Sequence, residues 1–236
     1  MRVHAMTIEI GQVEAIFRYP VKSMRGELLD AATIGWNGLD GDRRFAFRRL
    51  DERGEFPWLT ASKLPELLDF TPRLPTHVCT PEGEELALMG DALADEVGRR
   101  YGAPVQMMQL KNGIFDEASI SVITSETARE ITRLAGTRED VRRFRPNIVV
   151  RSTRSVPFEE DEWVGGTVAF GDDGPAVAVT MRDVRCVMVN FDPEGGPPEP
   201  AVLKAVVRAN QNHAGIYGTV TRTGRLAVGQ RIVLHR

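Results

Sequence analysis

The sequence lacks most of the patterns that identify common classes of enzyme and membrane protein. Its 236 residues include two cysteines, Cys79 and Cys186, so we expect no disulfide framework and a reducing, cytoplasmic setting. The four histidines show no metal-ligand spacing, and no zinc site is predicted. No stretch reaches the ~20 apolar residues of a membrane helix. Dinucleotide-binding, P-loop and serine-hydrolase motifs are also missing.

An excess of positive charge is missing as well. The chain carries 30 Lys and Arg against 33 Asp and Glu, a formal net charge of -3. Non-specific nucleic-acid binding depends on basic surface, so we expect no nucleic-acid partner. The N-terminal residues hold no long apolar segment, so we expect neither a signal peptide nor a membrane anchor. The hydrophobic fraction of 42% is that of a globular protein with a core.

Short alternating segments separated by glycine and proline dominate residues 1–112. A helix capped by Asp91 is predicted, with Leu93, Val97 and Tyr101 on one apolar face, and Gly102 should end it. This half therefore reads as a mainly β unit that can close as a barrel. Its strands are predicted over residues 13–19, 28–34, 43–49, 76–80, 84–88 and 104–110.

The turn at residues 111–113 marks the expected boundary between residues 1–112 and residues 113–236. In the second half, a helix should be capped by Thr124 or Ser125, and another should begin at Pro200. Both halves together predict a mainly β protein with a few helices, of the α+β class. Strands of the second half are predicted over residues 119–123, 148–150, 168–170, 176–181, 184–189, 215–221 and 225–234.

Three local features of the second half also carry structural expectations. Residues 141–144 should form a short helical turn. Arg145 precedes Pro146, which favours an extended backbone at Arg145. The acidic segment at residues 158–163 is expected to be a solvated loop.

The segment Met181–Pro193 surrounds Cys186 and carries the main chemical signal. Its apolar run predicts a strand, and side-chain alternation would place Cys186 on the same face as Val184. A lone cysteine in such a run is most often an inert buried hydrophobe. However, Arg182 and Arg185 flank the sulfur and favour the thiolate, which attacks electrophiles and binds metals. The residues themselves leave both interpretations open for Cys186, whereas Cys79 is interpreted as structural.

Several short motifs, in order along the chain, resemble a known family. In the second half, residues 143–150 (RFRPNIVV), residues 159–163 and Arg185-Cys186 before Asp192-Pro193 resemble the MOSC domain. In the first half, residues 19–23 (YPVKS), 41–43 (GDR) and 59–61 (LTA) are similar to the β-barrel that precedes MOSC domains. Taken together, these motifs are similar to those of the mitochondrial amidoxime-reducing component and its bacterial counterparts. The resemblance therefore implies an N-terminal β-barrel-like domain followed by a MOSC β-barrel.

This resemblance also implies a molybdenum-pyranopterin cofactor held between the two β units. Cys186 aligns with the cysteine that ligates molybdenum, and it would be both metal ligand and catalytic residue. Lys22, Arg145 and Asn147 fall at positions that contact the anionic end of the cofactor, where cationic and amide donors are suited to phosphate. Further cofactor-binding positions implied by the family are Thr60, Thr124, Ser125, Arg185 and Tyr217.

The sequence departs from the family after Thr60. Relatives have an arginine soon after this threonine, whereas the order here is Thr60, Ala61, Ser62, Lys63. We place Ser62 and Lys63 among the candidate cofactor-binding residues, with Lys63 as the nearest replacement for the missing charge. A lysine is a point charge and does not reproduce the bidentate fork of an arginine.

The resemblance predicts an oxidoreductase that reduces small N-hydroxylated substrates. The chain has no cysteine cluster for an iron–sulfur centre and no flavin motif, so an external donor is expected, a cytochrome or a ferredoxin with its reductase. One alternative is a carrier of sulfur, as a persulfide on Cys186, or of the molybdenum cofactor. The other is a non-catalytic binding module.

Overall fold

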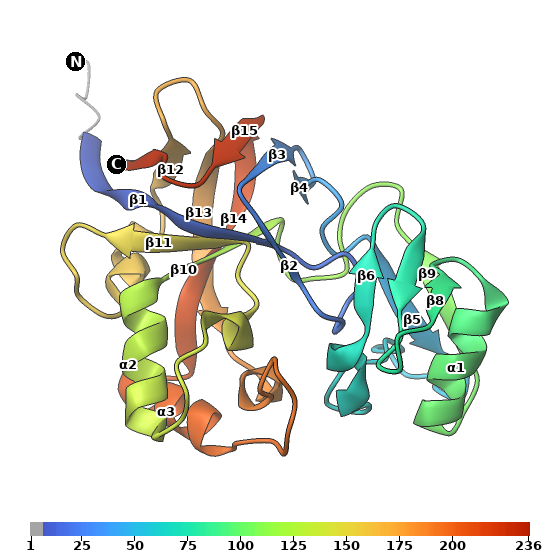
Figure 1. Cartoon of the computed structure of the whole chain (residues 1–236). Helices are drawn as coiled ribbons and strands as arrows, with labels where there is room; N and C mark the ends of the chain where they lie inside the picture. Colours follow the sequence, from blue (N-terminus) through green and yellow to red (C-terminus); the bar gives the residue numbers. More distant parts are fainter. Residues whose placement is uncertain (1–6) are drawn as a thin grey trace.

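The computed structural model describes residues 7–236 and shows two lobes (Figure 1). The larger lobe contains an eight-stranded sheet with helices α2 (Ser125–Ala135) and α3 (Ala201–Asn210) beside it. The smaller lobe contains short strands and helix α1 (Asp91–Tyr101). The prediction of a mainly β protein with a few helices is confirmed. No helix of the described residues is long and apolar enough to cross a membrane.

A closed barrel forms the centre of the larger lobe. An additional pairing between β11 and β1 closes seven of its strands, and β2 extends the sheet beyond β1. The interior is apolar, with Val13, Val150 and Phe170 at most 1% exposed. In sheet order the strands are β11 (Ile148–Ser152), β10 (Ile120–Thr124), β14 (His213–Arg222), β13 (Ala176–Val184), β12 (Thr167–Phe170), β16 (Arg231–His235), β1 (Thr7–Arg18) and β2 (Glu27–Leu29).

The smaller lobe packs its short strands around a second apolar cluster that includes Phe47, Leu67 and Phe70. Its elements are β5 (Phe45–Arg49) paired with β9 (Val105–Gln109), the sheet β6 (Thr71–Arg73), β7 (His77–Cys79) and β8 (Glu85–Ala87), and the 3-10 turn η1 (Pro65–Asp69). A third small sheet, beside the barrel, contains β15 (Gly224–Ala227), β3 (Ala31–Gly35) and β4 (Gly38–Leu39).

The helix boundaries follow local chemistry. The Thr124 side chain accepts a hydrogen bond from the backbone N–H of Thr127, which confirms Thr124 as the cap of α2. Gly136 ends α2 and Gly102 ends α1, each with a left-handed backbone that glycine adopts without strain. Helix α3 follows Pro200, as expected.

The expected strand over residues 184–189 is wrong. Strand β13 ends at Val184, and residues Val187–Asn190 form the 3-10 turn η4, with Cys186 immediately before it. The run is apolar because Val189 packs against helix α3, whereas Val187 is 46% exposed. The apolar residues of this run form a turn that packs on a helix. Periodicity in so short a run does not distinguish such a turn from a strand.

Two other local expectations are also wrong. Arg145 follows the 3-10 turn η2 (Val141–Phe144) and is left-handed, with φ 49° and ψ 45°, although it precedes proline. Tertiary hydrogen bonds at its carbonyl and guanidinium hold this conformation. The acidic segment forms the 3-10 turn η3 (Glu159–Trp163), and Glu160 is fully buried because two threonine hydroxyls donate to it.

The predicted strand over residues 28–34 is divided between two sheets, since β2 pairs with β1 and β3 pairs with β15. The expected domain boundary at residues 112 and 113 stays a prediction. Strand β1 belongs to the first half in sequence but lies in the barrel between β11 and β16. The first half thus supplies one barrel strand before it enters the smaller lobe.

Candidate functional site

A cavity of about 180 Å³ opens beside Cys186, and we call it the thiol cavity. Six of the predicted site residues line it: Lys22, Thr60, Arg145, Arg185, Cys186 and Tyr217. They come from the segment after β1, from the smaller lobe, from the loop before β11, from the end of β13 and from the middle of β14. Segments that are far apart in the sequence therefore meet around the sulfur atom of Cys186.

The Cys186 side chain is exposed. Its position at the turn between β13 and η4 places it at the mouth of the cavity rather than in the core. The neighbouring Val184 is also exposed, at 62%. The interpretation of Cys186 as an inert buried hydrophobe is therefore wrong. Cys79, in contrast, is half-buried in the smaller lobe and directs its sulfur to the Thr80 carbonyl at 3.6 Å.

Lys22 lies just after β1, where its backbone N–H donates to the Phe45 carbonyl. Its ammonium group donates to the Phe115 carbonyl at 2.8 Å. Burial lowers the pKa of Lys22, while the negative charges of Asp116 and Cys186 act in the opposite direction. Lys22 and Cys186 thus line the same cavity.

Arg43 organises the floor of the thiol cavity. Its guanidinium contacts the carboxylates of Asp42 and Asp116 at 2.6 Å each and donates to the Arg145 carbonyl at 2.7 Å. It also reaches the Asn147 amide oxygen at 3.4 Å. Burial lowers the pKa of Arg43, but the two carboxylates outweigh it and raise the pKa above its ordinary value.

Arg145 is the least neutralised cation of the site. One guanidinium nitrogen donates to the Met24 carbonyl at 2.9 Å, and the group lies 4.2 Å from the Tyr19 ring centroid. Its Nη2 is buried and finds no hydrogen-bond partner among residues 7–236. Burial lowers the pKa of Arg145 to about 10, and the neighbouring Arg43 charge acts in the same direction. An anionic ligand at this nitrogen would relieve both costs.

Arg185 is anchored beneath Cys186 by the carbonyls of Ala214 and Phe144, at 2.6 and 2.8 Å. Its Nη2 lies 2.9 Å from an oxygen of Asp183. Burial raises the pKa of Asp183 to about 6, against the effect of the Arg185 charge. Tyr217 completes this side of the cavity, and burial raises the pKa of its hydroxyl.

Five predicted residues lie outside the lining of the thiol cavity. Ser62 is exposed and its hydroxyl lies 2.8 Å from that of Thr60, while Lys63 is exposed. Thr124 and Ser125 are buried at the start of α2 and contact glutamates there. Asn147 is buried beneath the floor and accepts from the Ser121 backbone N–H at 3.1 Å.

Sequence reasoning missed four charged residues of this region: Arg43, Asp116, Arg143 and Asp183. Arg43 belongs to the GDR motif that supports the resemblance, and that motif was the signal available for it. Asp116 and Asp183 carry no local signal, because their roles depend on pairing with arginines distant in sequence. The Arg143 side chain is fully buried and contacts Asp192 and Glu199.

The donor set of the thiol cavity fits a molybdenum-pyranopterin cofactor. Cys186 offers a soft, accessible sulfur, the ligand type suited to a high-valent metal. Arg145 offers a buried N–H that has no partner among residues 7–236, and Lys22 offers a second cation. Within residues 7–236, no three His, Cys, Asp or Glu side chains gather in a group able to hold a metal ion.

Comparisons with known proteins agree with this architecture. A family model described as the MOSC N-terminal beta barrel domain matches residues 10–113, and one described as the MOSC domain matches residues 102–233. Among solved structures, the YUAD protein from Bacillus subtilis shares 16% identity over 98% of this chain and 98% of that chain, with a TM-score of 0.57. This likeness supports the fold.

Two other solved structures match less well. A hypothetical protein shares 10% identity over 98% of this chain and 69% of that chain, with a TM-score of 0.47. YiiM from Geobacillus stearothermophilus shares 20% identity over 50% of this chain and 54% of that chain, with a TM-score of 0.40. No curated protein matches the chain.

Proposed function

The chain belongs to the MOSC domain family, and from this premise we propose that it binds a molybdenum-pyranopterin cofactor and reduces small N-hydroxylated compounds. The observation that supports this proposal is an exposed thiol at the mouth of a cavity whose buried cations are not fully paired. Per turnover, one N–OH group takes up two electrons and two protons, and leaves as N–H and water.

Cys186 would hold the metal through its thiolate. The turn at η4 keeps the sulfur clear of the core. When bound, the cofactor supplies a metal centre that removes oxygen from the N–OH group and undergoes a two-electron change of oxidation state.

Lys22 and Arg145 would hold the anionic end of the cofactor. The two cations come from different halves of the chain and line one cavity. Arg43 positions Arg145 through the Arg145 carbonyl, and each of the three Arg43 nitrogens already has a protein acceptor. The ligand would thus bridge the two lobes, and its binding should stabilise their arrangement.

Electrons would arrive from outside the chain. Its two cysteines cannot hold an iron–sulfur cluster, which takes four protein ligands. The donor would be a cytochrome, or a ferredoxin with its reductase. It would approach the open side of the thiol cavity, where Cys186 and Val184 are exposed.

The test compares two matched cysteine variants produced in a molybdenum-replete host. Elemental analysis and pterin fluorescence measure cofactor content, and turnover is followed with an aryl amidoxime and a reduced viologen dye. Cys186→Ser should abolish turnover and reduce molybdenum content, because a hydroxyl is a poor soft ligand. Cys79→Ser, in the smaller lobe, should retain both. Unchanged turnover in Cys186→Ser protein that contains cofactor would refute the role of Cys186.

The carrier function remains the second candidate because Cys186 is exposed and adjacent to cations. A persulfide on Cys186 would be detected by mass spectrometry as the mass of one added sulfur atom, removable by a reductant. A persulfide without molybdenum would favour the carrier over the reductase. Copurification of molybdenum and pterin in equal amounts would exclude a module that binds neither.

A further inference from the structure

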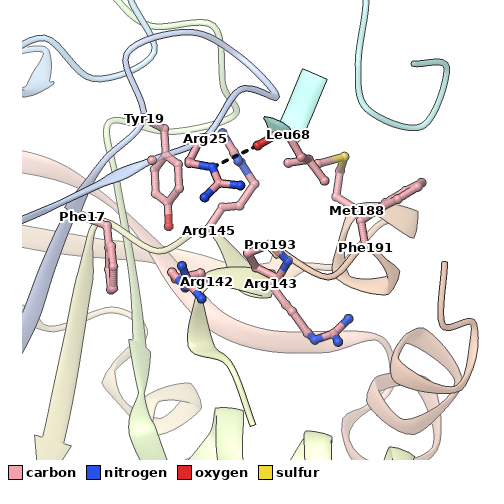
Figure 2. A pocket seen from close by; sticks show the side chains of 11 residues that line it. Phe17, Tyr19, Arg25, Leu68, Arg142, Arg143, Arg145, Met188, Phe191 and Pro193 are labelled. Carbon is pink, nitrogen blue, oxygen red and sulfur yellow. Dashed lines mark hydrogen bonds between the residues drawn. The ribbon is translucent and has the colours of Figure 1, made fainter. Parts of the chain in front are cut away.

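The Arg145 side of the thiol cavity is closed. Arg143, Arg145 and Met188 line the thiol cavity and also line a small space on their other side. Figure 2 shows that space, with Tyr19 and Arg25 beside Arg145. It measures about 30 Å³, which is close to the volume of one water molecule. A ligand of the thiol cavity therefore does not extend past Arg145, and a bulky ligand extends through the mouth.

The apolar side chains of the thiol cavity fall into two groups. Phe144 and Val189 are each 2% exposed and belong to the apolar cluster that includes residues of α2 and α3. Phe56 and Val184 also line the cavity, yet they are 56% and 62% exposed. We call Phe56 and Val184 the apolar rim. A single exposed apolar side chain needs no explanation, but two on one cavity provide apolar surface that a ligand can cover.

The apolar rim is held in place by both lobes. Phe56 lies between β5 and η1, and its carbonyl accepts a hydrogen bond from Nη2 of Arg49 at 2.8 Å. The centroid of its ring lies 5.9 Å from Nζ of Lys22. Val184 is the last residue of β13, two positions before Cys186. Each rim residue is thus close, in space or in sequence, to a residue that would hold the cofactor.

The charges of the thiol cavity restrict what the rim can bind. Cationic side chains outnumber carboxylates in the lining, so a positively charged ligand would be repelled. A negatively charged ligand would compete with the anionic end of the cofactor for Arg145. The part of a substrate that contacts the rim is therefore uncharged. The cationic residues of the lining are Lys22, Arg43, Arg143, Arg145 and Arg185, and the carboxylates are Asp116 and Asp183.

We propose that Phe56 and Val184 are specificity-determining residues that bind an uncharged aromatic ring of the substrate. This inference rests on the proposed function, in which the N–OH group is reduced at the cofactor held by Cys186. The preferred substrates are then aryl amidoximes, with the ring packed against the rim and the N–OH group directed into the cavity. Contact between two aromatic rings adds stabilisation beyond the burial of apolar area.

The experiment compares benzamidoxime with acetamidoxime, which carry the same N–OH group on a ring and on a methyl group. The full chain loaded with cofactor reduces each compound with a reduced viologen dye, and kcat and KM are measured separately. The parent should prefer benzamidoxime roughly tenfold or more in kcat/KM. Because the dye supplies the electrons, contacts with a protein donor do not affect this ratio.

Substitutions in the rim should reduce the preference for the aryl substrate. Phe56→Ser should raise the KM of benzamidoxime roughly three- to tenfold with little change in kcat, and Phe56→Leu should raise it less. Val184→Ser should raise it roughly threefold. Acetamidoxime should stay within about twofold in all three variants. The matched controls are Trp36→Ser and Val228→Ser, because these side chains are 67% and 45% exposed and lie outside the cavity lining.

A binding measurement does not depend on turnover. Without dye, calorimetry gives the dissociation constant of benzamidoxime for oxidised protein that contains cofactor. This constant should rise in Phe56→Ser by about the same factor as KM and stay unchanged in Trp36→Ser. Both substitutions are at exposed positions, so the variants should fold as the parent does.

The outcomes separate this inference from the proposed function. Parent protein that contains cofactor but reduces neither amidoxime would refute the proposed function, and this inference with it. A parent that reduces both, with the same substrate ratio in Phe56→Ser, would overturn the rim assignment and leave the proposed function intact. An equal loss with both amidoximes in Phe56→Ser would show that Phe56 supports the cofactor site instead of binding the ring, and would also overturn the assignment.

Discussion

Asp42 provides the sharpest test of how the two lobes are joined. Its carboxylate is fully buried and accepts hydrogen bonds from the Tyr19 backbone N–H at 2.7 Å and from Arg43 at 2.6 Å. Arg43 in turn holds the Arg145 carbonyl at 2.7 Å. Replacing Asp42 should therefore destabilise the fold and disturb Arg145, although Asp42 does not line the thiol cavity.

Two substitutions distinguish the contributions of the two hydrogen bonds that Asp42 accepts. Asp42→Asn retains an acceptor for the Tyr19 N–H but loses the charge opposite Arg43, and Arg43 keeps Asp116. A hydrogen bond to a charged group contributes about 1.5–3 kcal/mol, so this variant should lose about 2 kcal/mol. Asp42→Ala also leaves a buried N–H without an acceptor and should lose about 4 kcal/mol.

For a chain of this size, 1 kcal/mol corresponds to a shift of roughly 2–4 °C in the unfolding midpoint. Asp42→Asn should therefore lower the midpoint by about 4–8 °C and Asp42→Ala by about 8–16 °C, measured by circular dichroism. Asp40→Asn, at an exposed neighbouring position, should change the free energy of unfolding by less than about 0.5 kcal/mol. A midpoint that moves by less than about 2 °C in both Asp42 variants would refute the reasoning.

Three further predictions concern other parts of the molecule. Burial raises the pKa of Glu160 from 4.5 to about 7. Between these two pH values the folded state binds more protons than the unfolded state, so the free energy of unfolding should fall as the pH rises. Glu160→Gln should flatten that dependence and stabilise the protein at pH 8 by roughly 2–3 kcal/mol, in denaturant titrations at several pH values; an unchanged slope would contradict the burial effect. Gly26→Ala should cost roughly 1–3 kcal/mol of unfolding free energy because its Cβ meets the immobile Tyr19 ring, whereas Gly54→Ala, which meets only the end of the flexible Glu52 side chain, should be nearly neutral. Ser62→Arg, which restores the charge carried by relatives, should raise the molybdenum content of purified protein; a content equal to that of the parent would show that this position does not contact the cofactor.

The sequence predicted those parts of the fold that depend on neighbouring residues. The threonine cap of α2, its glycine end at Gly136 and the glycine end of α1 at Gly102 each need a single residue type at one position. Failures occurred where tertiary contacts overrode local preference. Arg145 adopts a left-handed backbone before proline because distant carbonyl and guanidinium partners hold it.

The candidate site was predicted unevenly for the same reason. Motif positions such as Lys22 and Cys186 could be named from the order of short segments along the chain. Asp116 and Arg43 lie 73 residues apart in the sequence yet form a 2.6 Å ion pair. No local sequence pattern predicts such a contact. The exposure of Cys186 could not be predicted either, because an apolar run indicates a strand even where the chain turns away from the sheet.

The same buried charges serve both the fold and the candidate site. Strand β1 ends at Arg18, and shortly afterwards Lys22 lines the thiol cavity. Arg43 then ties this segment to the loop that carries Arg145. Packing alone does not explain the burial of Arg43, because a paired buried charge adds little stability over an apolar core. The network holds Arg145 beside the thiol cavity with one nitrogen that has no partner among residues 7–236, and an anion bound there would accept a hydrogen bond from that nitrogen.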